Sequence, residues 1–250
     1  MSSSQAPDTM LPHLRVAVIA VALMLGITAG ATVATGYAET LNLSSQKLTP
    51  TRTCVVTATP SSTTSVIDAS VRQATSTTNY GTSTTNDVAS STSANRRLYI
   101  KFDLSGCVPT IAASATVRVA TLRMYVSTLP AACRTLDIFR VGATWSESVI
   151  TWTNQPFGTT INNPATSSRT DSFNVGTPAG CENLAVGYIT GADVTTDVAA
   201  FVAGSATNNG WMIRDDTENS STARTTTFSA KNLGTLAQAP QLTVTYVTVP

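Results

Sequence analysis

The sequence is poor in charged residues. Asp, Glu, Lys and Arg together make up 12% of its 250 residues, about half the usual share, and the formal net charge is +1. Without a basic field the chain has little to hold a phosphate backbone, which argues against nucleic acid as a partner. Glu and Lys, which favour helices, are scarce, whereas Thr and Val, whose branched side chains fit a pleated sheet, are common. The composition therefore favours a β-sheet protein.

Histidine is almost absent. The one histidine, His13, lies in the N-terminal segment, so the rest of the chain has no Ser-His-Asp or Cys-His nucleophilic set and no histidine ligand for zinc. A pair of facing carboxylates, as in glycosidases, is the remaining route to catalysis. The candidates are Glu147, Glu182, Glu218 and the aspartates, although Glu147 fits a turn beside two tryptophans better. We expect no enzymatic activity; an enzyme would cleave a polysaccharide and lose that activity on Glu147→Gln or Glu182→Gln.

Aromatic residues are also few, at 6% of the chain. Trp145, Trp152 and Trp211 suggest sugar stacking, because flat rings pack on pyranose faces. A β-sandwich with so few aromatic residues, however, needs its largest side chains for the core. We therefore expect the three tryptophans to be core residues.

An apolar run near the N-terminus indicates export. Residues 16–27, VAVIAVALMLGI, are followed by small residues up to GYA, which ends at Ala38 and offers the small-x-small pattern of a signal peptidase site. We expect residues 1–38 to be a signal peptide and the protein to be secreted. The uncharged stretch 16–38 is also long enough to span a bilayer. A retained anchor at the cell surface is therefore the alternative, and the only case in which a membrane is a partner.

Four cysteines lie beyond the export segment. They form no C-x-x-C pair, and an even number of cysteines in an exported chain predicts two disulfides rather than a zinc site. Four cysteines allow three connectivities, and the sequence alone does not choose among them. Because Cys107 and Cys133 flank one strand-rich segment, we expect a Cys107–Cys133 bond and a Cys54–Cys181 bond.

The rest of the chain has the pattern of one all-β domain. Residues 39–63 are a Ser/Thr-rich lead-in, either a linker or an extended strand, and residues 64–250 alternate short strand-like runs with turns, which is typical of a sandwich. About 190 residues are enough for one such domain with a real core. The residues that alternation places toward the core are Leu98, Ile100, Phe102 and Leu104; Ala120, Leu122, Met124 and Val126; and Leu242, Val244 and Tyr246.

Two segments depart from this alternation. In TLDIFRV, Leu136 and Ile138 share one face while Phe139 and Val141 take the other, which indicates either a bulge or a strand covered on both sides. In DVTTDVAAFVAG, residues 193–204, the apolar residues recur with helical spacing and a glycine follows, so this segment predicts a short helix.

An acidic turn follows the strand candidate that contains Trp211. Asp215, Asp216 and Glu218 could hold a structural calcium ion through carboxylate oxygens, but the spacing is not that of an EF-hand loop. A solvated turn is the simpler interpretation. We expect no other cofactor.

Six segments in order resemble the DNRLRE-domain family, which is also classed as a carbohydrate-binding module family. They are NRRLYIKFDLSG (95–106), IAASATVRVATLRMYV (111–126), ATWSESVITWTNQP (143–156), DVTTDVAAFV (193–202), NGWMIRDD (209–216) and APQLTVTY (239–246). The resemblance implies an antiparallel, jelly-roll-like β-sandwich that is secreted or surface-displayed, with alginate among the family's ligands. The cysteines are not part of the resemblance.

A polysaccharide ligand, especially an acidic one, calls for cations and exposed rings. By alternation Arg97, Lys101 and Arg123 point outward, and they share one face if their two strands are neighbours; Arg72 and Arg96 are further cationic candidates. We predict a non-catalytic module for a polysaccharide or cell-wall glycan. The alternative is a structural or adhesive protein of the cell envelope or matrix. The predicted ligand-binding residues are Arg97, Lys101, Arg123, Tyr99, Tyr125 and Tyr80.

Overall fold

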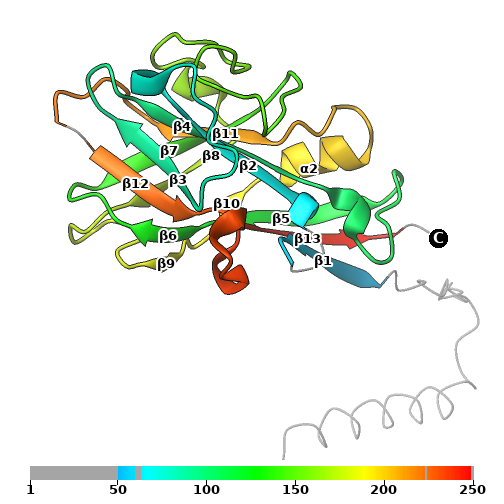
Figure 1. Ribbon diagram of the computed structural model, residues 1–250. Coiled ribbons are helices and arrows are strands. Elements are labelled where there is room, and N and C mark those ends of the chain that lie inside the picture. The colour runs from blue at the N-terminus through cyan, green and yellow to red at the C-terminus, as the bar shows by residue number, and fades with distance from the viewer. Residues whose placement is uncertain (1–49, 60–62, 223, 249–250) are drawn as a thin grey trace, which may run out of the picture. The chain divides into compact units, whose positions relative to one another are not determined.

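The computed structural model describes residues 50–59, 63–222 and 224–248 (Figure 1). The predicted signal peptide or anchor lies outside these residues, as does most of the lead-in up to residue 49. In the described part, no helix is both long and apolar enough to cross a membrane.

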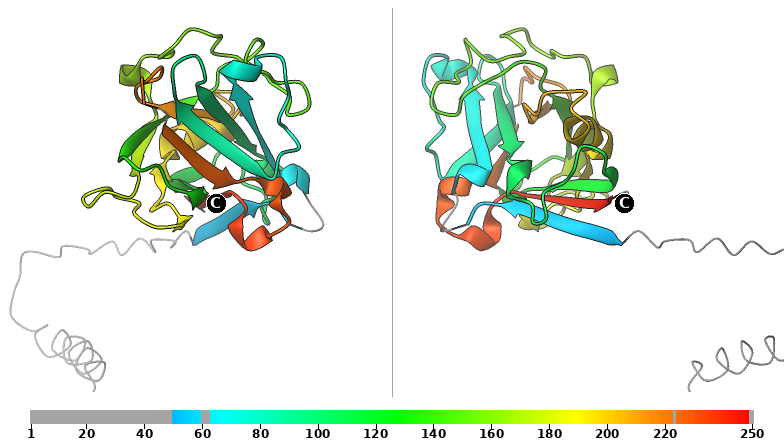
Figure 2. Two further views of the ribbon diagram at one scale, coloured as in Figure 1. Left: turned by 60° about the vertical axis from the view of Figure 1, so that its left-hand side comes forward. Right: turned by 90° about the vertical axis from the view of Figure 1, so that its right-hand side faces the viewer.

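The domain is built from two antiparallel sheets with one short α-helix (Figures 1 and 2). The smaller sheet has the order β1 (Thr51–Thr57), β13 (Gln241–Val247), β5 (Thr116–Arg123) and β10 (Ala192–Asp193). The larger sheet has the order β8 (Asp171–Val175), β7 (Arg134–Arg140), β11 (Trp211–Asp215), β4 (Arg96–Phe102), β3 (Thr85–Ser90), β12 (Arg224–Ser229), β6 (Tyr125–Thr128) and β9 (Gly187–Tyr188), and β2 (Val66–Arg72) also pairs with β4.

Short helices complete the described fold. The α-helix α2 (Thr195–Val202) lies where the sequence predicted a helix, and its Val198 is buried in the core together with the preceding Val194. Six 3-10 turns connect strands: η1 (Thr63–Ser65), η2 (Gln73–Thr75), η3 (Leu104–Gly106), η4 (Thr166–Ser168), η5 (Lys231–Leu233) and η6 (Leu236–Gln238).

The main core confirms the predicted alternation. Side chains from β4, β5, β6 and β13 pack together between the sheets, because each strand turns its apolar face inward. Leu104 is only partly buried, since it lies in η3 after β4 has ended. The predicted residues that are fully enclosed are Leu98, Ile100, Phe102, Ala120, Leu122, Met124, Val126, Leu242, Val244 and Tyr246.

A second core lies on the other face of the larger sheet. There, Ile150 and Trp152 from the segment between β7 and β8 pack on residues of β2, β4, β7 and β11. Leu136 and Ile138 belong to the main core, whereas Phe139 and Val141 belong to this second one. Of the two interpretations of TLDIFRV, the strand covered on both sides is therefore the correct one. We call residues 142–170, which connect β7 to β8, the cover segment.

The two disulfides join other pairs than the sequence analysis predicted. Cys54 bonds to Cys107 and Cys133 bonds to Cys181, each with a Cα–Cα separation of 5.6 Å. The predicted pairing is wrong because Cys54, on β1, turns toward the main core where Cys107 is buried. Cys133 directly precedes β7, and the pairing of β7 with β8 brings it close to the loop that holds Cys181. Two disulfides indicate an oxidising compartment.

Candidate functional site

The predicted ligand residues do not share one surface. β4, which carries Arg97, Tyr99 and Lys101, belongs to the larger sheet, whereas β5, which carries Arg123, belongs to the smaller one. The two strands are not neighbours, so the condition for a single cationic face is not met. The predicted ligand residues therefore lie in different environments.

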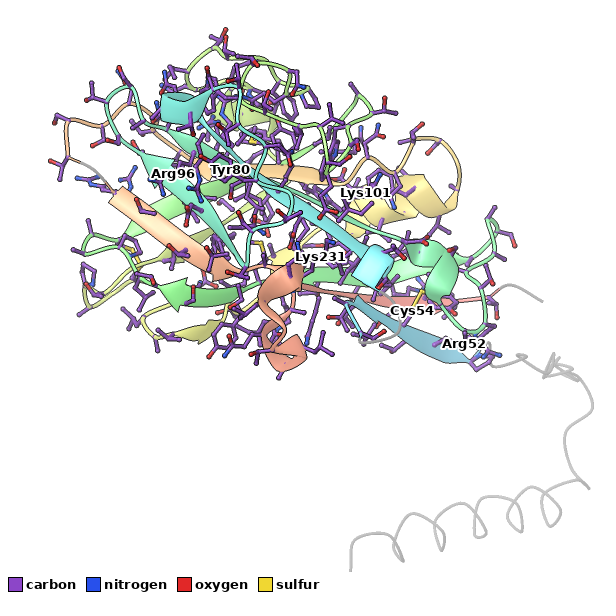
Figure 3. The ribbon with its side chains drawn as sticks, viewed as in Figure 1. Arg52, Cys54, Tyr80, Arg96, Lys101 and Lys231 are labelled. Carbon is purple, nitrogen blue, oxygen red and sulfur yellow. A yellow bond between two sulfur atoms is a disulfide. The ribbon has the colours of Figure 1, made fainter. Side chains whose placement is uncertain are left out.

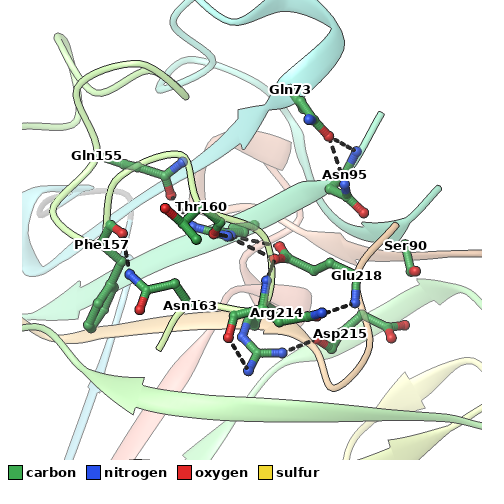
Figure 4. Close-up of polar contacts among 12 residues, drawn as sticks. Gln73, Ser90, Asn95, Gln155, Phe157, Thr160, Asn163, Arg214, Asp215 and Glu218 are labelled. Carbon is green, nitrogen blue, oxygen red and sulfur yellow. Dashed lines mark hydrogen bonds and ion pairs between the residues drawn. The ribbon is translucent and has the colours of Figure 1, made fainter. Parts of the chain in front are cut away.

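Arg97 is fully buried, which corrects the prediction that it points to solvent. Its Nε donates to Glu218 Oε1 at 2.7 Å and its Nη2 to Glu218 Oε2 at 2.8 Å. Its Nη1 donates to the carbonyl oxygen of Gly158 at 3.0 Å, and Nη2 also donates to that of Thr160 at 2.7 Å. Two of its partners, Glu218 and Thr160, are labelled in Figure 4. Alternation did place Arg97 on the face away from the main core, but the cover segment lies over that face. Arg97 ties the cover segment to β4.

Tyr99 is buried beside Arg97, so its predicted exposure is also wrong. Its hydroxyl donates to Gln155 Oε1 at 3.0 Å, and its ring meets the Trp145 ring edge-on at a centroid distance of 5.6 Å. Burial raises the pKa of the Tyr99 hydroxyl well above its usual value. Tyr99 therefore contacts the cover segment through both its hydroxyl group and its ring.

The acidic turn is occupied by arginines. Arg134 Nη2 forms ion pairs with Asp215 and, at 2.9 Å, with Asp216, while Glu218 holds Arg97. Asp215 and Glu218 are buried, so the turn is not the solvated one that was expected. Among the described residues, no group of three or more His, Cys, Asp or Glu side chains is arranged to hold a metal ion.

Lys101 lies near a cleft in the cover segment, although it is not one of the lining residues. The cleft has a volume of about 440 Å³, and Trp145, which is only partly buried, lies in its wall. The Lys101 ammonium is 5.8 Å from the centroid of the Trp145 ring, and Lys101 lies toward α2 on the sheet (Figure 3). We call this site the Trp145 cleft; its lining residues are Thr144, Trp145, Ser146, Val149, Ile150 and Asn154.

Hydrogen bonds hold the Trp145 cleft in shape. The Trp145 Nε1 donates to the carbonyl oxygen of Asn209 at 2.8 Å. Asn79 Nδ2 donates to the carbonyl oxygens of Glu147 at 2.7 Å and Ile150 at 2.8 Å. Asn154 Oδ1 accepts from the Thr151 backbone N–H at 2.7 Å. The cleft is therefore formed by a braced loop and not by isolated side chains.

A glycine fixes the relation between Lys101 and Trp145. Gly210 has φ of +70°, and a Cβ there would lie 2.1 Å from the Ile100 carbonyl oxygen and 2.7 Å from the Lys101 Cα. Only glycine adopts this backbone and allows this approach without strain. The preceding residue, Asn209, is the one that accepts from Trp145. Gly210 thus allows β4 near Lys101 to come close to the chain segment that holds the Trp145 indole.

Tyr80 lies on the loop that braces the cover segment. The guanidinium of Arg72 stacks on its ring at 4.0 Å from the centroid, and its hydroxyl hydrogen-bonds with Thr75 Oγ1 at 2.7 Å. Arg72 and Arg96 both form ion pairs with Asp87 at 2.8 Å. These two cations therefore share one carboxylate partner within the fold.

Arg123 and Tyr125 form a separate cluster with Tyr188. The Arg123 guanidinium lies 4.8 Å from the centroid of the Tyr188 ring, and the Tyr125 and Tyr188 rings meet edge-on at 5.4 Å. The Tyr188 hydroxyl lies 2.7 Å from the Ala239 carbonyl oxygen, and burial raises its pKa. All three side chains are partly exposed. A role for Arg123 and Tyr125 in ligand binding stays a prediction.

A comparison with known families decides the class of ligand. The family model of carbohydrate-binding module family 96 matches residues 59–246. The chain belongs to this family. Membership in family 96 implies that residues 59–246 are a carbohydrate-binding module. A search of the curated proteins finds no match.

Membership in family 96 agrees with the chemistry of the cleft. A binding module is a non-catalytic unit, and the Trp145 cleft is lined by an aromatic residue together with apolar and uncharged polar residues. Glu147 is adjacent in sequence, but its Oε1 accepts from the Asp68 backbone N–H at 3.1 Å and pairs with Lys231 Nζ at 3.2 Å. It acts as a brace for the cover segment, in keeping with the turn role predicted for it.

Sequence reasoning missed the role of Trp145. The prediction that tryptophans serve the core is confirmed for Trp152 and Trp211, which are buried, but Trp145 is only partly buried and lines a cleft. The flanking residues carried no clear signal, because small polar residues flank both Trp145 and the buried Trp152 in the sequence.

Proposed function

We propose that the chain is a secreted, non-catalytic module that binds an acidic polysaccharide in the Trp145 cleft, with Lys101 beside the sugar carboxylate. The observation that carries the proposal is the juxtaposition of a partly exposed tryptophan and an unpaired cation at the edge of a cleft. Family membership supplies the carbohydrate, and the residues at the cleft supply the preference for acidic sugars.

The lining of the cleft suits a sugar ring. A sugar presents an apolar face, which packs on an aromatic ring, and an edge of hydroxyl groups, which need donors and acceptors. Trp145 offers the ring, while Thr144, Ser146 and Asn154 offer hydroxyl and amide groups. The volume, about 440 Å³, falls in the range of small-ligand sites.

Lys101 favours a negatively charged sugar. Among the described residues it forms no ion pair, whereas Arg72, Arg96, Arg97 and Lys231 are all paired with carboxylates. An ammonium that lies beside an aromatic ring and forms no ion pair attracts a carboxylate without first having to break a salt bridge. Because this charge is partly exposed, its contribution decreases as salt increases.

The bracing of the cover segment supports affinity. Asn79, Asn154 and the Asn209 carbonyl hold the loop that carries Trp145, so less conformational entropy is lost when a sugar binds. The two disulfides fit an extracellular site of action, where a polysaccharide or cell-wall glycan is the partner.

Affinity electrophoresis of the full-length chain tests this function. The gels contain alginate, cellulose, chitin or peptidoglycan, each at several salt concentrations. We expect retardation by alginate that weakens as salt is raised, at least tenfold weaker binding for Trp145→Ala, and a smaller loss with a flatter salt dependence for Lys101→Gln.

Two matched variants serve as controls. Trp145→Phe keeps a ring and is expected to keep most of the affinity, while Lys231→Gln removes a lysine that is already paired with Glu147. Retention that is the same for Trp145→Ala and wild type would place the site elsewhere, with the Arg123–Tyr125–Tyr188 cluster as the next candidate. No retention on any of the polymers would favour the structural alternative.

A further inference from the structure

A second and larger pocket lies at the start of α2. It has a volume of about 530 Å³ and shares no lining residue with the Trp145 cleft. Five elements meet there: the end of β7, the turn η4, the start of β8, β10 and the first turn of α2. The pocket is lined by Arg140, Ser168, Arg169, Thr170, Asp171, Asp193, Thr196 and Asp197.

The floor of this pocket is fixed by Asp197. Its Oδ2 accepts from Thr170 Oγ1 at 2.6 Å and from Trp211 Nε1 at 2.9 Å, and its Oδ1 accepts from Arg140 Nη1 at 3.2 Å. With three donors satisfied and only 5% of its surface exposed, Asp197 is a structural anchor. It holds Arg140 in place at the pocket.

The other charged side chains at the pocket already form hydrogen bonds or ion pairs, but they can form more. Asp171 Oδ2 accepts from the Asp193 backbone N–H at 2.6 Å, and Asp193 Oδ1 accepts from that of Thr195 at 2.9 Å. Each of these carboxylates can accept further bonds through its other oxygen. The side chains of Arg140 and Arg169 are 44% and 42% exposed, so most of their five donors remain accessible.

The balance of charge at the pocket selects a class of ligand. A sugar carboxylate would meet Asp171, Asp193 and Asp197, and a cation would meet Arg140 and Arg169. An uncharged vicinal diol meets neither obstacle, because each hydroxyl can donate to a carboxylate and accept from a guanidinium at once.

From these contacts we propose that the pocket is a second saccharide site, which binds the vicinal hydroxyls of an uncharged sugar between Asp171 and the guanidinium groups of Arg140 and Arg169. It rests on the family's carbohydrate-binding role but not on the Trp145 cleft. The module would then hold an acidic and a neutral sugar unit at separate places.

Calorimetric titration of the full-length chain with neutral oligosaccharides tests the second site. The probes are mannotetraose, cellotetraose and xylotetraose, with trigalacturonate and CaCl₂ as charged counterparts. We expect at least one neutral probe to bind with an affinity that salt does not change. Asp171→Asn keeps the acceptor for the Asp193 N–H but removes the charge, and Thr196→Trp fills the pocket from the exposed side of α2; each should weaken binding at least tenfold.

The controls separate this site from the Trp145 cleft. Trp145→Ala should leave the binding of the neutral probe unchanged. Thr110→Trp, at an exposed threonine that lines neither of the two pockets, should also have no effect. The proposal is overturned if no neutral probe binds, if Asp171→Asn and Thr196→Trp bind it as wild type does, or if trigalacturonate or Ca²⁺ displaces it. Loss of neutral binding in Trp145→Ala would show that both sugars use one cleft.

Discussion

The two outer faces of the sandwich differ although their strands have the same alternation. On β4, Arg97 and Tyr99 alternate with core residues and lie beneath the cover segment. On β13, Thr243 and Thr245 alternate with core residues and remain on an open face, where the neighbouring Val55 of β1 is 55% exposed. Period-two patterning therefore identifies the face that meets the main core, but it does not tell whether the other face meets solvent or a second layer.

The largest expected effect is at the buried ion pair of the covered face. Glu218→Ala leaves Arg97 charged and unpaired within the cover, which should lower the free energy of unfolding by about 3 to 5 kcal/mol. Urea unfolding followed by tryptophan fluorescence measures it. Glu182→Ala, at an exposed glutamate, is the matched control and should change stability by less than about 0.5 kcal/mol. Equal effects of the two variants would mean that the cover contributes little.

A second effect depends on pH. Burial raises the pKa of the Asp68 carboxyl from 3.8 to about 6, with the nearby Glu147 acting in the same direction and the Lys231 N–H opposing it. The folded state therefore binds this proton more tightly than the unfolded state does. The resulting stabilisation is complete below about pH 4 and is lost as the pH rises through about 6.

Asp68→Asn should remove this dependence. The variant should be more stable than wild type at pH 7 by about 2 to 3 kcal/mol, and the two proteins should converge near pH 4. Thermal unfolding of both proteins across this range is the measurement. A variant that is less stable than wild type at pH 7 would show that the carboxylate is better compensated by Lys231 and Asn86 than its burial implies.

The third prediction links the cover to the Trp145 cleft. Gly210→Ala forces a Cβ against the Ile100 carbonyl oxygen, and we expect a loss of about 1 to 3 kcal/mol together with weaker binding of alginate. Gly204 has nearly the same φ, +71°, but open space around it. Gly204→Ala therefore isolates the backbone cost and should leave binding intact, as affinity gels on both variants would reveal.

The smallest effects belong to the open face. Thr243→Ala and Val55→Thr change side chains that face solvent, so each should alter stability by less than about 0.5 kcal/mol and leave polysaccharide retention unchanged. Thermal unfolding and the affinity gels test this. A loss above 1 kcal/mol in either variant would indicate that this face is also covered by another part of the protein.

The main core could be read from the sequence because it depends on local alternation. Leu98, Leu122 and Val244 are each buried as predicted, and α2 lies where helical spacing placed it. The sandwich and the family also agree with the prediction. Strand alternation and helical spacing depend on residues that are close in the sequence, which is why they could be predicted.

The candidate site was harder to predict because it depends on contacts between distant segments. Arg97 is buried by residues 155–160, some sixty positions further along, and nothing near Arg97 in the sequence announces them. The apolar residues on both faces of TLDIFRV indicated either a bulge or a strand covered on both sides, but they did not identify which segment covers it. The predicted disulfide pairing was wrong for the same reason, since strand order and not spacing along the chain decides which cysteines meet.

The Cys54–Cys107 bond also determines how the domain responds to mechanical load. β1 is an edge strand that pairs only with β13, so tension applied ahead of Thr51 would begin to peel it residue by residue. After three residues the tension reaches Cys54, where a covalent link passes it to Cys107, in the chain just beyond β4. Cys107 lies in the chain between β4 of the larger sheet and β5 of the smaller one, so the load passes to both sheets. The covalent bond thus protects the part of β1 that follows Cys54, residues Val55–Thr57, from being peeled off β13 by force applied at this end.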